Sequence, residues 1–321
     1  MHRILFLLLA GSGLFAQSPL RPVHTYSIEA RDSITGDLGV AVQSHYFSVG
    51  GTVPWAEAGV GAVATQSFVE TRYGRGGLDL MRQGYSAPAA LKELLAADKG
   101  RDVRQVAMVD ASGRVGSHTG PKCIQAAGQE AGEGFSVQAN LMGKPSVWPA
   151  MAKAFREAKG DLADRMLAAL RAAEEEGGDI RGRQSAAILI VRGKASLRPW
   201  DDRIFDLRVE DHPAPVEELT RLVRLRRAYL LADQGDAFAT EGKWNEATAA
   251  YESAVRLAPQ IVELPFWHAV ALVNAKRLEE ALPLFKAVFI KDPAYRQLLR
   301  RLVQCEQLPN DTALMARIES Q

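Results

Sequence analysis

The sequence predicts an α+β domain followed by an all-α helical repeat domain. In the first part of the chain, runs rich in Val, Ile and Ala and bounded by Gly come first, amphipathic helical patterns follow, and another strand pattern closes the region. This order favours an antiparallel sheet with helices packed on it over a βαβ repeat. After the closely spaced Pro213 and Pro215, the pattern becomes almost wholly helical and repeats at a fixed interval.

Residues 1–16 have the pattern of a secretory signal peptide. Arg3 supplies a short positive region, Ile4–Ala10 is apolar, and Ala16 offers a small residue at the cleavage position. The apolar stretch is shorter than the roughly 20 residues that span a bilayer. We therefore expect an exported protein, periplasmic or secreted, with no membrane association after signal cleavage. Residues 17–24 would then form a leader.

The first domain is predicted over residues 25–209, with a linker at 210–216. Its strands are predicted at Thr25–Ala30, Gly39–Ser44, Val60–Thr65, Val103–Val109, Gly134–Val137 and Ser185–Val191. Its helices are predicted at Gly76–Gln83, Ala87–Ala97, Ser146–Ala158 and Leu162–Glu175.

The second domain, residues 217–321, contains an internal repeat. Five positions recur after 34 residues: Gly235, Ala247, Tyr251, Ala254 and Pro259 return as Ala269, Ala281, Phe285, Val288 and Pro293. The spacing and the small residues resemble the tetratricopeptide repeat, with flanking helices at 217–230 and 295–318. A repeat stack predicts a concave surface for a protein or peptide partner. An ordinary helical bundle, the alternative, implies no partner.

Composition excludes several classes of protein. Lys and Arg total 39 against 38 acidic residues, a balance that argues against a nucleic-acid or membrane-surface protein. The histidines are scattered and Gly74-Arg-Gly-Gly77 lacks a phosphate-binding fingerprint, so we expect no metal and no cofactor. Cys123 and Cys305 fall in different domains, which favours two reduced, buried thiols over a disulfide.

Thr25 is the candidate nucleophile. A threonine hydroxyl needs a base, and the α-amine of a chain that began at Thr25 could serve, with a pKa near roughly 7.7–8. This mechanism requires removal of every residue before Thr25. By residue type alone, Thr25 and Ser27 could instead be ordinary strand residues.

Polar residues at several strand ends could form a cleft around Thr25. Thr25 and Ser27 share one face of their strand, while Ser44 and Gln66 end the next two. Gln138 and Asn140 alternate on one face of a later strand and suit oxyanion donation, or they could make strand-edge hydrogen bonds. We take Thr25, Ser27, Ser44, Gln66 and Asn140 as catalytic candidates.

A second group of residues is predicted to bind substrate. Asp179, Arg181 and Arg183 stand at the start of a strand, where the arginines could clamp a carboxylate or simply pair with Asp179 to hold a turn. His118, before a Thr-Gly turn, and Gln138 complete this group.

Several blocks of the first domain resemble one known family. The blocks are Thr25–Asp32, Gly39–Ser44, Gly59–Gln66, His118–Gly120, Ser136–Asn140 and Gly178–Ala186. They are similar to the N-terminal nucleophile (Ntn) hydrolase-like family called domain of unknown function 1028. The resemblance implies a four-layer αββα sandwich, and kinship with amide hydrolases that use an N-terminal nucleophile.

Two functions follow as hypotheses. The first is an exported Ntn-type hydrolase that cuts a small amide or peptide-like bond with Thr25. The second is a non-catalytic periplasmic scaffold whose helical repeats contact a partner.

Overall fold

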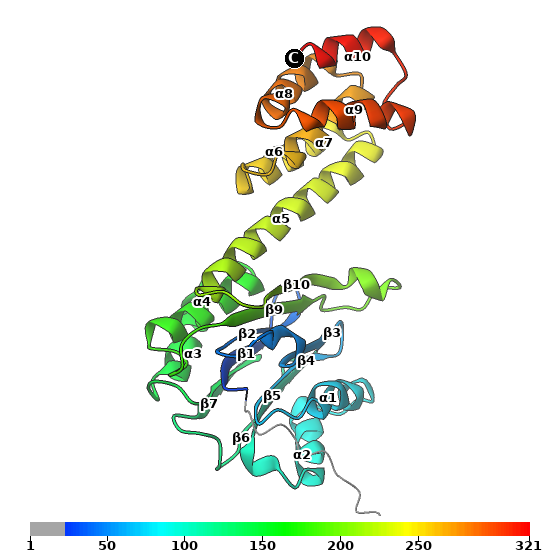
Figure 1. Ribbon diagram of the computed structural model, residues 1–321. Helices are drawn as coiled ribbons and strands as arrows, with labels where there is room; N and C mark the ends of the chain where they lie inside the picture. Colours follow the sequence, from blue (N-terminus) through cyan, green and yellow to red (C-terminus); the bar gives the residue numbers. More distant parts are fainter. Residues whose placement is uncertain (1–22) are drawn as a thin grey trace, which may run out of the picture. The chain divides into compact units, whose positions relative to one another are not determined.

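The computed structural model describes residues 23–321, which form two compact units whose boundary in the sequence falls between Val216 and Glu217 (Figure 1). The predicted signal peptide, 1–16, and most of the predicted leader, 17–24, lie outside the described residues.

Two antiparallel sheets make up the centre of the first unit. The larger has the strand order β10-β9-β2-β1-β8-β7, and the smaller has the order β3-β4-β5-β6. The strands of the larger sheet are β1 (Thr25–Arg31), β2 (Leu38–Ser44), β7 (Gly128–Gly132), β8 (Phe135–Ala139), β9 (Ser185–Val191) and β10 (Arg203–Val209). The strands of the smaller sheet are β3 (Pro54–Glu57), β4 (Gly61–Ser67), β5 (Arg104–Asp110) and β6 (Val115–Thr119). Because β1 pairs with β2 on one side and β8 on the other, it is an interior strand.

Helices cover the outer faces of both sheets (Figure 1). Two pack on the smaller sheet, α1 (Arg72–Arg82) and α2 (Ala87–Ala97), and two on the larger, α3 (Val147–Glu157) and α4 (Leu162–Glu175). Side-chain caps mark the start of α2 and α4. The side chains of Ser86 and Asp161 accept hydrogen bonds from the backbone N–H groups of Ala89 and Asp164, respectively.

The space between the sheets is apolar on one side and polar on the other. Strand alternation sends every second residue into this space. Beneath β2 and β9 the contacts are apolar and involve Val40, Val42 and Leu189. Beneath β1 and β8 fully buried polar residues such as Ser27 and Gln138 take their place. A polar interior of this kind is tolerated only where its groups are hydrogen-bonded.

The prediction of a mixed α/β region with antiparallel sheet is confirmed, but four strands were not predicted. β7 has the sequence GQEAG, and β6 has VGSHT, so both lack the Val and Ile enrichment of the predicted strands. β3 begins with a proline, and β10 carries several charges. Their pairing partners hold them in the sheets, against local propensity. The helix predicted from Gly76 begins earlier, at Arg72.

The second unit is helical, as predicted. Its helices are α5 (Pro215–Thr240), α6 (Trp244–Leu257), α7 (Glu263–Asn274), α8 (Leu278–Lys291), α9 (Ala294–Gln304) and α10 (Thr312–Glu319). α5 runs unbroken through the end of the predicted linker, the flank predicted at 217–230 and Gly235. The recurring positions Ala247 and Tyr251, and their counterparts Ala281 and Phe285, are all buried.

Both cysteines are free thiols. Cys123 is buried, but the prediction that Cys305 is buried is wrong, because this residue lies exposed just after α9 ends. Within residues 23–321, no helix combines the length and apolar character that a membrane span requires.

Candidate functional site

The predicted nucleophile lies where the ends of several strands meet. Thr25 opens β1 and is the register partner of Ser44, the last residue of β2. Asn140 directly follows β8, and its backbone N–H donates to the Thr25 carbonyl at 3.1 Å. Gln66, from the end of β4 in the other sheet, donates its side-chain N–H to the same carbonyl at 3.2 Å. The structure thus brings together four of the five catalytic candidates around one residue.

The Thr25 side chain is fully buried. Its hydroxyl lies 2.9 Å from the Val23 carbonyl oxygen and 3.2 Å from the Ser44 hydroxyl. The single hydroxyl proton can serve only one of these acceptors at a time. The hydroxyl, on the residue that follows the peptide bond between His24 and Thr25, thus has two alternative acceptors.

The carbonyl oxygen of His24 accepts two side-chain hydrogen bonds. One comes from the Ser44 hydroxyl, and the other comes from Nη2 of Arg181 at 3.0 Å. Donors aimed at one carbonyl oxygen are the arrangement that stabilises negative charge developing on it during acyl transfer. Within the cluster of residues around Thr25 (Ser44, Gln66, Asn140 and Arg181), Ser44 and Arg181 are therefore the pair placed to stabilise such a charge.

Asp179 holds Arg181 in place. The guanidinium binds it through two contacts, Nε to Oδ1 at 3.0 Å and Nη2 to Oδ2 at 2.6 Å, a bidentate geometry that fixes the orientation of the arginine. The Asp179 side chain is 0% exposed and also accepts the backbone N–H of His45 at 3.2 Å. Of the two alternatives predicted for this block, the Asp179–Arg181 pair is present, and the carboxylate clamp stays a prediction. Arg181 also presents one N–H group to the His24 carbonyl.

A network of buried side chains joins the two sheets next to the cluster. The Ser27 hydroxyl donates to Gln66 Oε1 at 2.8 Å and accepts from Gln138 Nε2 at 2.8 Å. Gln66 Nε2 in turn donates to Gln105 Oε1 at 2.7 Å. Ser27 and Gln138 therefore support Gln66, and neither contacts the Thr25 hydroxyl in the bonds found here.

Glu29 is the one carboxyl group in this network, and it is fully buried. Burial raises its pKa well above the ordinary value, and the bonds from Gln138 and Ser27 offset only part of that effect. Its Oε2 has no hydrogen-bond partner. The carboxyl group consequently keeps its proton to a higher pH than an exposed glutamate.

His24 is also buried, 3% exposed. Its Nδ1 lies 2.7 Å from Oδ1 of Asn140. Burial lowers the pKa of the imidazole, although the bond to Asn140 acts in the opposite direction. The ring is thus biased toward its neutral form.

Two residues beside the cluster have left-handed backbone conformations. Ser67, the last residue of β4, has φ 68°, and Leu141, which follows Asn140, has φ 59°. Each such non-glycine residue costs about 1–3 kcal/mol, and such residues concentrate at functional sites. Ser67 exchanges backbone hydrogen bonds with Val23, so this conformation shapes the position of the segment before Thr25.

The structure does not bring two of the predicted substrate-binding residues to the cluster. His118 Nε2 bonds the Arg101 carbonyl at 2.9 Å instead. Arg183 lies 3.5 Å from Glu174 and contacts neither Asp179 nor His24 in the bonds found here. The sequence did not predict Gln105 as a site residue. It is the partner of Gln66 on the neighbouring strand β5, and strand alternation along β5 is the signal that could have indicated it.

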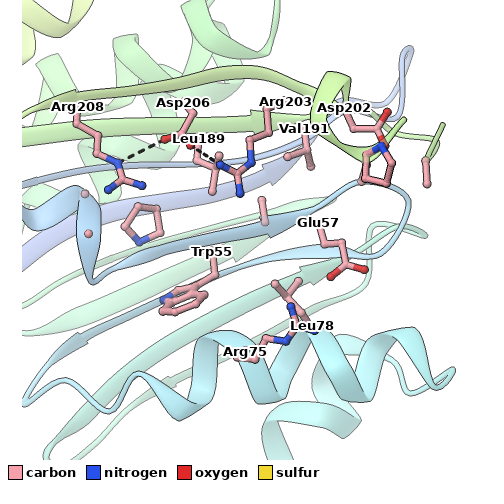
Figure 2. Close-up of a pocket in the computed structure, with 17 residues that line it drawn as sticks. Trp55, Glu57, Arg75, Leu78, Leu189, Val191, Asp202, Arg203, Asp206 and Arg208 are labelled. Atoms are coloured by element: carbon pink, nitrogen blue, oxygen red, sulfur yellow. Dashed lines mark hydrogen bonds and ion pairs between the residues drawn. The ribbon is translucent and has the colours of Figure 1, made fainter. Parts of the chain in front are cut away.

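A cavity of about 590 Å³ lies elsewhere, between β3 and β10, and none of the predicted site residues lines it. Figure 2 shows Asp206 between Arg203 and Arg208 on one wall, with Trp55 opposite. Asp206 pairs with both arginines, at 2.8 and 3.4 Å. In the described part of the chain, no group of three or more His, Cys, Asp or Glu side chains is placed to hold a metal ion.

Comparison with known proteins gives a family but no activity. The model of a family of unknown function, DUF1028, matches residues 25–219. A similar solved structure is the crystal structure of protein SPO2555 from Silicibacter pomeroyi, described as a DUF1028 protein. The two are 30% identical with a TM-score of 0.56, over 62% of this chain and 84% of that one. No curated protein matches the chain.

Proposed function

The chain belongs to the DUF1028 family of unknown function, and from the geometry around Thr25 we propose that it is an Ntn-type hydrolase that cuts an amide bond with the Thr25 hydroxyl. One observation carries the proposal. The His24 carbonyl oxygen accepts hydrogen bonds from Ser44 and Arg181, while the Thr25 hydroxyl lies beside the same peptide bond. The strained Ser67 and Leu141 add support.

The first reaction would free the α-amine of Thr25. The Thr25 hydroxyl attacks the His24 carbonyl carbon, and Ser44 and Arg181 stabilise the charge on the oxygen. The carbon–nitrogen bond breaks, the nitrogen takes the hydroxyl proton, and an ester joins His24 to the threonine oxygen. Water then hydrolyses this ester, which releases the leader as a carboxylic acid and leaves a chain that begins at Thr25.

Turnover of a substrate would repeat the same chemistry. The free amine accepts the proton of the Thr25 hydroxyl, directly or through one water, and the oxygen attacks the substrate carbonyl. The substrate amine leaves with that proton, and water hydrolyses the acyl-threonine ester. The substrate would be a small amide or a peptide-like molecule, met in the periplasm or outside the cell.

The architecture is consistent with this assignment. Helices lie on the outer faces of two stacked antiparallel sheets, the order of layers that an αββα Ntn-hydrolase-like sandwich requires. In the helical unit, four of the five pairs of positions that recur after 34 residues are buried, all except Pro259 and Pro293, and this burial supports a tetratricopeptide-like stack. Such a stack would serve the enzyme as a docking module for a protein or peptide.

Substitution of Thr25 tests the proposal. Thr25→Ala should abolish both leader removal and turnover of an amide panel without unfolding the protein. Thr25→Ser, which keeps a hydroxyl group, should retain part of both reactions. Undiminished turnover by Thr25→Ala would eliminate the proposed nucleophile.

A non-catalytic scaffold is the second candidate. The observation that favours it is the complete burial of Thr25. A pull-down of a partner that is lost on deletion of residues 217–321, together with no turnover in amidase screens, would decide for the scaffold.

A further inference from the structure

Val23 and His24 are held in the cluster as a bound peptide would be. Val23 pairs with Ser67 as in an antiparallel sheet, with Val23 N–H donating to Ser67 O at 2.7 Å and Ser67 N–H donating to Val23 O at 2.9 Å. The two residues are 4% and 3% exposed. Backbone pairing at a strand edge is a general way to bind an extended peptide.

The His24 side chain also has a specific partner, Asn140. The orientation of this amide follows from its neighbours. Gln105 Nε2 donates to the carbonyl oxygens of Ala139 and Gly128, at 2.9 and 3.2 Å, so Gln105 Oε1 must be an acceptor. Asn140 Nδ2 donates to that oxygen at 2.8 Å. Oδ1 of Asn140 is therefore left as an acceptor facing the imidazole.

The orientation of the Asn140 amide determines which side chains can occupy the position of the His24 side chain. Nδ1 of His24 must carry a proton to bond with Asn140 Oδ1 at 2.7 Å. The ring edge also meets Phe68, with 6.5 Å between ring centroids and an interplanar angle of 86°. A leucine side chain here would leave a buried oxygen unpaired, and a glutamate would set a carboxylate against it. A carboxamide could still donate an N–H group.

The following inference rests on the proposed function, in which cleavage of the bond between His24 and Thr25 vacates the position of Val23 and His24. We infer that the groups binding these two residues form the acyl-side substrate site of the enzyme. It takes an extended peptide whose residue before the cleaved amide carries a side-chain N–H donor, histidine first and asparagine second. Ser67 pairs with the peptide backbone, Asn140 selects the side chain, and Ser44 with Arg181 binds the carbonyl oxygen. Water is the only co-reactant, and the products are a peptide acid and an amine.

A series of four substrates tests the inference. The protein is purified after expression of the full chain, and its N-terminus is read by intact mass. N-acetyl-Val-X-p-nitroanilides are then compared, with X as His, Asn, Leu or Glu. We expect kcat/KM for His to exceed that for Leu and Glu by about 10-fold or more, the effect of one buried acceptor left unpaired, with Asn between them.

A binding measurement separates recognition from catalysis. The product acid N-acetyl-Val-His should bind by calorimetry and compete with the anilide, whereas N-acetyl-Val-Leu should bind about 10-fold more weakly. Asn140→Ala should reduce the ratio of the His and Leu rates toward one. Ser136→Ala, a change on the same face of β8 whose hydroxyl bonds Gln138 instead, should keep that ratio. A ratio within one variant does not depend on how much of the protein is folded.

The outcomes distinguish the inference from the function on which it rests. Equal rates for His and Leu, with no competition by N-acetyl-Val-His, overturn the inference and leave the hydrolase standing. Selective binding of N-acetyl-Val-His without turnover of any anilide supports the site and overturns the hydrolase. A purified protein that retains residues 23 and 24 overturns both, because its site stays filled.

Discussion

Arg181 donates a hydrogen bond of 3.0 Å to the carbonyl oxygen of His24, across 157 positions of the sequence. The contact depends on Asp179, which binds the guanidinium at two points. A side chain at the entrance to β9 is thereby aimed at the peptide bond before Thr25. The proposed reaction at Thr25 rests on this contact.

Removal of this donor should slow both reactions at Thr25. Loss of one oxyanion donor typically costs about 10²–10³-fold in rate. We therefore expect Arg181→Gln to slow leader removal by about that factor, measured as a time course of intact mass. Arg183→Gln is the matched control, since Arg183 lies near Glu174 and not near His24. Equal rates for the two variants would exclude Arg181 from the chemistry.

Glu29 predicts a pH dependence of stability. Its pKa is raised in the folded state, so the unfolded chain loses this proton at a lower pH than the folded chain. The contribution of Glu29 is present below the ordinary pKa and is lost as pH rises toward the folded value. The Glu29→Gln side chain has no proton to lose. As the pH rises from 5 to 8, the free energy of unfolding of this variant should therefore increase relative to that of wild type. Urea unfolding at four pH values measures the difference, and a constant difference would contradict the assignment.

Gly74 should resist substitution although it lies within a helix. A Cβ atom at Gly74 would lie 2.4 Å from the Trp55 ring, which a hydrogen bond to Thr52 holds in place. Gly74→Ala should therefore destabilise the protein by about 1–3 kcal/mol, as overpacking does. At Gly76, two residues along α1, the nearest atom is the flexible end of Leu94 at 3.3 Å. Gly76→Ala should be neutral or stabilise by up to about 1 kcal/mol. The free energy of unfolding of both variants is measured with urea. Equal changes for Gly74→Ala and Gly76→Ala would contradict the close contact between Gly74 and Trp55.

The helical unit predicts a contrast within α8. Phe285 is fully buried and packs against Phe266 and Phe289, whereas Ile290 is 71% exposed. Phe285→Ala should cost about 3–5 kcal/mol, and Ile290→Ala should change stability by less than about 0.5 kcal/mol. Denaturant unfolding followed by circular dichroism measures both. A small loss at Phe285 would mean that the helices do not pack as described.

Strand alternation and strand ends identified most residues of the candidate site, but they did not show that these residues meet. Thr25, Ser44, Gln66 and Asn140 each interrupt or end an apolar strand pattern, and a polar residue at that place needs partners inside the fold. Once the strands pair, those residues meet. The choice of candidate residues is thus encoded locally, whereas their meeting depends on the pairing of the strands and the stacking of the two sheets.

Other features of the structure, the orientation of His118 and the cavity between β3 and β10, depend on strand pairings that no local sequence pattern shows. His118 stands beside Thr119 on β6, and adjacent strand residues point to opposite faces. Thr119 is the one that bonds Gln105, so His118 faces away from the cluster. The cavity between β3 and β10 was equally hidden, because both strands are held by their neighbours and not by their own propensity.

The N-terminal residue of the purified protein decides whether the α-amine of Thr25 is free. Cells express the full chain of 321 residues, and the product is analysed by intact mass and N-terminal sequencing, with Thr25→Ala as control. We expect a chain that begins at Thr25, and a Thr25→Ala control that keeps His24. A fully active protein in which His24 is still joined to Thr25 would contradict it.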